Sequence, residues 1–427
     1  MQTQGIKKAP SASVVIPHYL FGAVSFLVCS VLIVFSTDAF SGHYFHPKLL
    51  SITHLMALGW GSMIIFGALY QLLPVILDTP LYNESLAKIT FGIFAAGSIY
   101  LAFSFWNFYV GIHIQIASCL ILTAFILFTF NIIQTARNIP KWPIEADFIV
   151  TSTVWLLLTG IVGILMAFNF RYAFLPKSHL LFLKIHAHLG IAGWFVLLII
   201  GVASKLIPMF LLSHQLNKKK LSYSYYFINI GLIALSADLF FYEGSRLLTI
   251  YAGSILTGIL FFITYLFDAF KERARKKLDV GLKHSFLAFI IFLLPLFLGI
   301  IFSIKSSTNG ETLQQVYLIY GIAIFFGFIT SLILGQTFKT LPFIVWLYKY
   351  QKRAGKEKIP LPKDLYSEKL ATLQFIVYII ALITTIAGVL LNRMPLARTG
   401  AVLLLLTAIL YNLNVFKIVF IRTVPKS

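Results

Sequence analysis

Twelve long apolar stretches constrain this chain more than any other feature. Each is long enough to cross a hydrocarbon core about 30 Å thick, which takes about 20 residues of helix. They cover roughly 13–36, 48–78, 88–107, 108–133, 148–170, 182–212, 223–241, 247–270, 284–304, 315–346, 369–391 and 399–420. Because a backbone in lipid must satisfy its own hydrogen bonds, the sequence predicts an all-α membrane protein. Its twelve transmembrane helices form one polytopic domain over residues 1–427.

The net charge of +20 follows this predicted topology. The two tails and the even-numbered loops hold 24 of the 34 Lys and Arg residues, whereas the odd-numbered loops hold 8. By the positive-inside rule, both termini are expected in the cytoplasm, in a bacterial inner membrane. Basic clusters in inside loops attract anionic lipid headgroups. The bilayer is therefore the expected partner of these charges, and nucleic acid is not.

One helical pattern recurs along the chain. The stretch HLMALGWGSMIIFGALYQLLPV at 54–75 returns after 134 residues, and again, with weaker matches, after another 134. The matched columns are His54 with His188, Gly59 with Gly193 and Gly327, Trp60 with Trp194, Gly67 with Gly201 and Gly335, and Pro74 with Pro208 and Pro342. Ile322 replaces histidine in the third copy. The pattern predicts three four-helix units, about 13–133, 148–270 and 284–420, around a pseudo-threefold axis.

Three histidines of the second and sixth helices lie near the predicted outer surface: His54, His186 and His188. An imidazole buried without a partner costs roughly 2–7 kcal/mol, so each needs something to bind. Because His54 and His188 share a column and a depth, we expect them on opposite faces of a haem between the second and sixth helices. His186 points about 200° away from His188, toward a neighbouring gap that would hold a second haem or a metal.

Other polar residues leave alternatives open. His113 is either a packing or proton-relay residue or a ligand of copper or iron, and the outer-loop residues His43, His46 and His179 could join a metal site or remain solvated. Asp238 is either functional, as intramembrane acids often are, or paired with Arg246. For Lys205 and Lys339, snorkelling to the headgroups is favoured over a place in a proton path.

The motifs H-L-x-x-x-G-W at 54–60 and H-x-H-L-G-x-x-G-W at 186–194 resemble subunit I of the haem-copper oxidases, a group that includes nitric oxide reductases and NnrS-type membrane proteins. The resemblance implies haem b, one or two per chain, with His54 and His188 as the low-spin ligands and His186 on a second haem. It also implies that arginines of the last outer loop, Arg393 and Arg398, meet the haem propionates. Arg171 is an equal candidate for that role. An electron donor, quinol or cytochrome c, and further subunits would be its partners.

The chain departs from that family in its copper site. The family carries H-x-H on helix ten and copper ligands on helices six and seven, whereas here Ile322 lies on helix ten and helix seven has no histidine. The usual copper centre is therefore not supported, and copper binding stays open. We expect a haem protein of this superfamily for electron transfer, or for binding or reducing NO or O2, which would make it an oxidoreductase. The alternatives are a metal-ion or proton-coupled transporter and a non-catalytic haem-handling or assembly subunit.

Overall fold

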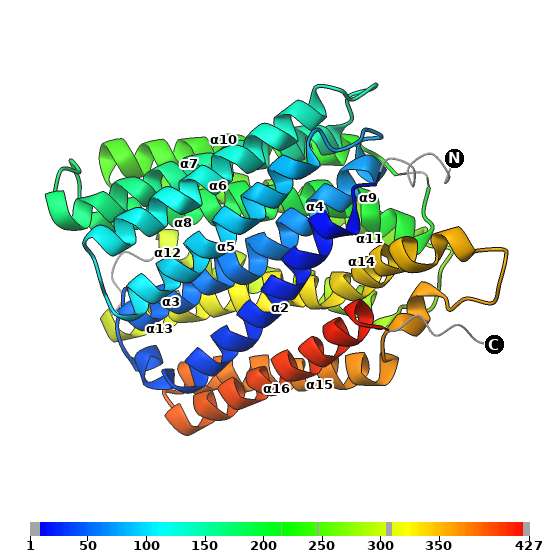
Figure 1. Ribbon diagram of the computed structural model, residues 1–427. Helices are drawn as coiled ribbons and strands as arrows, with labels where there is room; N and C mark the ends of the chain where they lie inside the picture. Colours follow the sequence, from blue (N-terminus) through cyan, green and yellow to red (C-terminus); the bar gives the residue numbers. More distant parts are fainter. Residues whose placement is uncertain (1–8, 215, 246, 305–309, 422–427) are drawn as a thin grey trace.

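The computed structural model describes residues 9–214, 216–245, 247–304 and 310–421. Within them, twelve helices are long and apolar enough to cross a membrane, and no residue is in a strand. This confirms the predicted all-α fold. The helices run side by side in one bundle, with the first and the last described residues at the same end (Figure 1). We call that end the terminal end and the opposite one the far end.

Nine spans are single helices, and three are built from two α-helices joined by a π-helix. The single helices are α2 (Ala12–Val34), α5 (Glu84–Trp106), α6 (Ile112–Ala136), α7 (Ile144–Tyr172), α10 (Lys219–Tyr242), α11 (Leu248–Lys271), α12 (Val280–Ile304), α15 (Glu368–Leu390) and α16 (Met394–Val419). The composite spans are α3 (Pro47–His54), η2 (Leu55–Ser62) and α4 (Met63–Ile76); α8 (His179–His188), η3 (Leu189–Val196) and α9 (Leu197–Leu211); and α13 (Gly310–Ile322), η4 (Ala323–Ile329) and α14 (Thr330–Tyr350). Short 3-10 turns η1 (Thr37–Ser41), η5 (Gln351–Arg353) and η6 (Pro362–Leu365) lie in the loops.

The three π-helices occupy one position of the predicted repeat. They begin directly after His54, His188 and Ile322, which are the residues of the histidine column. π-Helical turns are rare and frequently occur at functional sites. The composite spans are also more buried than most of the others. The second, sixth and tenth spans are thus the inner helices of the bundle, and each changes its winding at the same depth.

Two glycines in each inner span allow the first helix of its unit to cross at close range. A Cβ atom added to the first glycine column would meet the crossing helix at Ser25, Trp155 and Ile291, for Gly59, Gly193 and Gly327 respectively. At the second column, Gly67, Gly201 and Gly335 would meet His18, Phe148 and His284, with 2.5–2.6 Å between Cβ atoms. In all three crossings the contacted residues are seven apart. These contacts support the predicted threefold repeat, because they recur in the same register.

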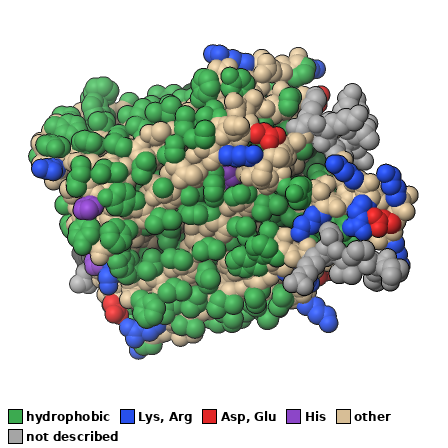
Figure 2. All heavy atoms as spheres, in the orientation of Figure 1, with side chains coloured by type: hydrophobic (Ala, Val, Ile, Leu, Met, Phe, Trp, Pro, Cys, Tyr) green, Lys and Arg blue, Asp and Glu red, His purple; other side chains and the backbone are tan. Residues whose placement is uncertain are grey.

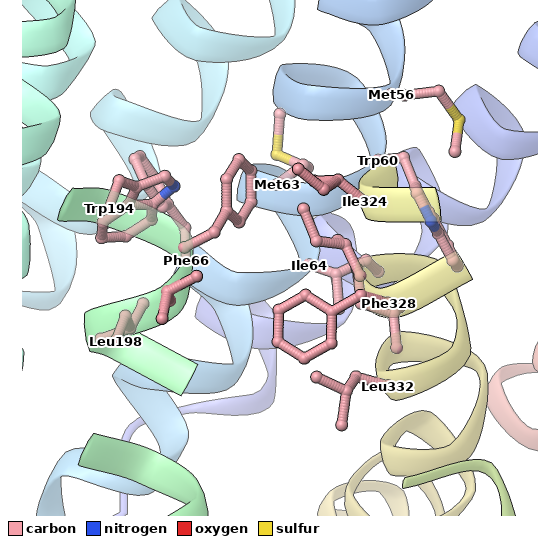
Figure 3. Close-up of a cluster of buried hydrophobic side chains, with 14 of the residues drawn as sticks. Met56, Trp60, Met63, Ile64, Phe66, Trp194, Leu198, Ile324, Phe328 and Leu332 are labelled. Carbon is pink, nitrogen blue, oxygen red and sulfur yellow. The ribbon is translucent and has the colours of Figure 1, made fainter. Parts of the chain in front are cut away.

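Hydrogen bonds between the inner spans join unlike columns of the repeat. Trp60 Nε1 donates to Thr330 Oγ1 at 3.1 Å, and Trp194 Nε1 donates to Ser62 Oγ at 2.9 Å. In both bonds a tryptophan of one unit donates to a hydroxyl of another unit, and that hydroxyl lies two residues further along the repeat pattern. Contacts between such unlike positions are the head-to-tail contacts expected around a rotation axis. Figure 3 shows side chains of all three inner spans packed in one apolar cluster around this level.

The structure shows the surroundings of three charged residues whose roles the sequence did not decide. Asp238 accepts hydrogen bonds from the Ser245 backbone N–H and hydroxyl, at 2.8 and 2.5 Å, whereas Arg246 lies outside the described residues. Lys339, expected to snorkel, forms an ion pair with Asp279, which directly precedes α12, and keeps only 12% of its side chain exposed. Lys205 is exposed, in line with snorkelling.

Candidate cofactor site

A cavity of about 190 Å³ lies between the second, third, fourth, fifth and sixth spans. On the same measure one water needs only roughly 10–15 Å³, so this space is large enough for an organic group. Apolar and aromatic side chains form most of its wall, and none of the described residues that line it is Asp, Glu, Lys or Arg. The wall reaches from Phe45, Phe170 and His179 at the far end to Trp194 and Phe125 deeper in the bundle.

Two imidazoles lie close to each other in the lining of this cavity. His54 ends α3, and His186 lies in the last turn of α8, so the second and sixth spans supply one histidine each. Their ring centres are 6.3 Å apart and their planes differ by 28°. A metal with one imidazole on each side, at bonds of about 2 Å, holds the ring centres roughly 6–6.5 Å apart. The separation therefore fits two axial ligands of one metal.

The hydrogen bonds of both histidines prepare them to bind a metal. His54 Nδ1 lies 2.7 Å from the Leu50 carbonyl oxygen, and His186 Nδ1 lies 3.0 Å from that of Thr159. Because a carbonyl oxygen only accepts, each Nδ1 carries the proton and donates it. Each Nε2 then keeps a free lone pair, which is the form of histidine that ligates metals, held by a backbone carbonyl behind it.

Glycines of α7 keep the space beside His186 open. A Cβ atom on Gly163 would lie 3.0 Å from His186 Cε1 and 3.5 Å from its Nδ1. Apart from its own helix, no other described atom would lie within 4 Å of it. Gly160, one turn earlier, also lines the cavity, where an added Cβ would meet the Phe125 ring at 2.8 Å. Larger side chains at these two positions would fill the cavity or displace the imidazole.

His188, the expected partner of His54, is not among the residues that line this cavity. Its Nδ1 lies 2.7 Å from the Lys184 carbonyl oxygen, the same i to i−4 bond that His54 makes with Leu50. The cavity thus brings His54 together with His186 and not with His188, the partner that the repeat column predicts. The reason is the 200° between His186 and His188, which sends them to different gaps.

The arginines expected at haem propionates lie away from the cavity. Arg398 Nη2 donates to Asp38 Oδ1 at 2.9 Å, so it joins α16 to the loop of η1. Arg393 precedes α16 and is exposed, and Arg171 is exposed with its guanidinium 5.7 Å from the Tyr172 ring centre. None of the three lines the cavity. The site thus lacks the arginine contacts that the sequence resemblance implied.

The remaining candidate metal ligands are also dispersed. His113 is exposed and bonds to the Tyr100 hydroxyl at 2.8 Å, outside the cavity. His43 Nδ1 and His46 Nδ1 accept hydrogen bonds from backbone N–H groups of Phe45 and Lys48. Their Nδ1 lone pairs are therefore occupied. Across the described ranges, no group of three or more His, Cys, Asp or Glu side chains is placed to hold a metal ion.

The donor set and the walls fit a metalloporphyrin. Neutral imidazoles are common axial ligands of haem iron, and apolar walls suit a flat hydrophobic ring. Sequence reasoning found both histidines but expected His54 to share a haem with His188, and that pairing stays a prediction. Sequence reasoning did not identify Gly163. A small residue on a helix next to a candidate ligand can indicate space for a cofactor.

Comparisons with known proteins agree with this architecture. No family model matches the chain. An uncharacterised protein of Aquifex aeolicus (strain VF5) is 25% identical over 299 residues, which are 70% of this chain and 72% of that protein. A solved haem-copper terminal oxidase dimer superposes with a TM-score of 0.64 at 12% identity, covering 96% of this chain and 85% of that one. The chain therefore has the fold of a haem-copper terminal oxidase.

Proposed function

We propose that this integral membrane protein binds haem b in the cavity between the second and sixth spans, with His54 and His186 as axial ligands. The observation that carries the proposal is the pair of imidazoles 6.3 Å apart, each with Nδ1 donating to a backbone carbonyl. When bound, a haem with two imidazole ligands accepts and releases single electrons. Electron transfer is therefore the function that this site supports best.

The protein's own residues would orient the ring and exclude water. Leu50 and Thr159 hold the two imidazoles through their carbonyl oxygens, so the ligands need little rearrangement on binding. Apolar side chains of α5, α6 and α7 form the walls, and the indole of Trp194 is tied to Ser62 in the second span. This bond fixes the spacing of the two spans that carry the ligands.

Binding or reduction of NO or O2 is proposed only for a second centre. An iron held by both His54 and His186 would have no free position for a gas, so gas chemistry would need a ligand outside this pair. His188 is suited to that role because its Nδ1 also donates to a carbonyl and leaves Nε2 free. The electron donor, quinol or cytochrome c, and any further subunit belong to the same proposal.

The first test is the pigment of the protein purified from a haem-replete host. A pyridine haemochrome assay should give at least one haem b per chain, and the oxidised protein should show a six-coordinate low-spin Soret spectrum. Iron and copper analysis of the same sample separates a haem centre from a copper site. Folded, colourless protein that carries zinc or copper across liposome membranes would instead support the transporter alternative.

A further inference from the structure

A third histidine of the cavity wall is held in the opposite protonation form from the two proposed ligands. His179 begins α8 at the far end of the cavity. Its ring packs between Phe170 and Phe45, with ring centres 4.4 and 5.6 Å away. Its Nε2 is shielded from solvent and has no hydrogen-bond partner among the described residues.

Asn169 determines which nitrogen of His179 carries the proton. The Leu175 backbone N–H donates to Asn169 Oδ1 at 2.9 Å, so the amide nitrogen of Asn169 is the end that faces His179. That Nδ2 lies 3.4 Å from His179 Nδ1. Because an amide nitrogen only donates, His179 Nδ1 accepts and its proton resides on Nε2. The unpartnered nitrogen is therefore a donor, without the lone pair that a metal needs.

A buried N–H group without an acceptor is unfavourable, and the cavity's ligand is the group placed to supply one. Haem carries two carboxylates on one edge of an otherwise apolar ring. Arg171, Arg393 and Arg398 lie elsewhere, and the lining includes no Lys or Arg within the part of the chain that the structure describes. Two hydroxyls of the wall are already used, since Ser118 donates to the Gln115 carbonyl and Thr159 to that of Trp155.

We propose that His179 Nε2–H donates a hydrogen bond to a carboxylate of the bound cofactor, so that the acidic edge of the ring faces the far end of the bundle. This inference rests on the proposed haem site and adds its orientation. His54 and His186 would hold the iron, while His179 would recognise the side chain that distinguishes haem from its esters. Hydrogen bonds to ionised acceptors are stronger than neutral ones, which makes the contact measurable.

The test compares haemin with haemin dimethyl ester, whose carboxylates are masked. Apo-protein from a haem-deficient host is titrated with each, and the Soret change gives the two affinities. For His179→Phe we expect about a tenfold loss of haemin affinity and unchanged affinity for the ester. His179→Gln, which restores an N–H donor, should recover part of the loss. His113→Phe is the matched control, because it removes an exposed imidazole outside the cavity.

The outcomes separate the two proposals. If the unmodified protein binds neither compound, the proposed haem site is wrong and the orientation falls with it. If it binds haemin and His179→Phe binds both compounds as the unmodified protein does, the haem site stands and the role of His179 is overturned. An equal loss for haemin and ester also overturns it, since that result assigns His179 to packing alone.

Discussion

Replacing His186 by alanine should abolish the six-coordinate low-spin haem spectrum. The side chain supplies one of two imidazoles whose ring centres are 6.3 Å apart, and its removal leaves His54 as a single ligand. We expect a shift to a five-coordinate high-spin Soret band and at least a tenfold lower affinity for haem. His54→Ala should give the same result, because the two ligands act on one metal. Absorption spectra of the oxidised and dithionite-reduced proteins measure this directly.

His188→Ala is the matched control and also the discriminating variant. It removes an imidazole two residues away on the same helix, with the same backbone hydrogen bond but outside the cavity. The low-spin spectrum should survive this change. If His188→Ala loses the low-spin spectrum and His186→Ala keeps it, His54 and His188 hold the haem. The proposed pair of His54 and His186 would then be wrong.

Gly163→Leu should empty the cavity of haem while the protein remains folded. A Cβ atom at this position already comes within 3.0 Å of His186 Cε1, and the rest of a leucine side chain would extend into the space proposed for the porphyrin. The backbone itself tolerates the change, since leucine favours helix over glycine. We expect haem content to fall to less than a tenth. Haemochrome assays of purified protein, with melting temperatures, measure both effects.

The control for this variant is Gly92→Leu in α5. Gly92 is also inside a membrane helix, but an added Cβ atom there would meet nothing within 4 Å, and the position is exposed on the bundle. Haem content should be unchanged in this protein. Full haem loading of Gly163→Leu, at the stoichiometry of the unmodified protein, would place the cofactor elsewhere.

The twelve spans were predictable because lipid demands long apolar helices, and their sequence signal is strong. Basic residues gather in the predicted inside loops, and Figure 2 shows most of the visible Lys and Arg side chains toward one end of the bundle, with few on its apolar flank. The glycine columns found in the sequence coincide with close helix crossings, for example at Gly67 and Gly335. The π-helices were not foreseen, because backbone winding has no composition signal of its own.

The histidines of the cavity were predictable, but the sequence did not indicate that His186, and not His188, would lie next to His54. If the units are related by rotation, as the repeat predicts, equivalent residues point into successive gaps, and His54 and His188 then face different spaces. The bond from Trp194 to Ser62 follows the same rule, since it joins two different columns. His186, on the other face of its helix from His188, is the residue that turns back toward His54. A threefold arrangement therefore favours ligands from unlike columns.

The tautomers of the cavity histidines required the structure. Nothing in the sequence shows that His186 reaches the carbonyl of Thr159, 27 residues earlier, or that the Asn169 amide is oriented by Leu175. These contacts decide which nitrogen is free to bind a metal and which one donates. All three histidines line one cavity, but His54 and His186 carry the proton on Nδ1 whereas His179 carries it on Nε2.

The central claim is that one iron lies between His54 and His186. Anomalous diffraction at the iron absorption edge, from crystals of the haem-replete protein, locates that atom without reference to any model of the cofactor. The account predicts an iron peak within bonding distance of Nε2 of both histidines. Iron bound to His188 with none between His54 and His186, or no iron in a folded protein, would contradict it.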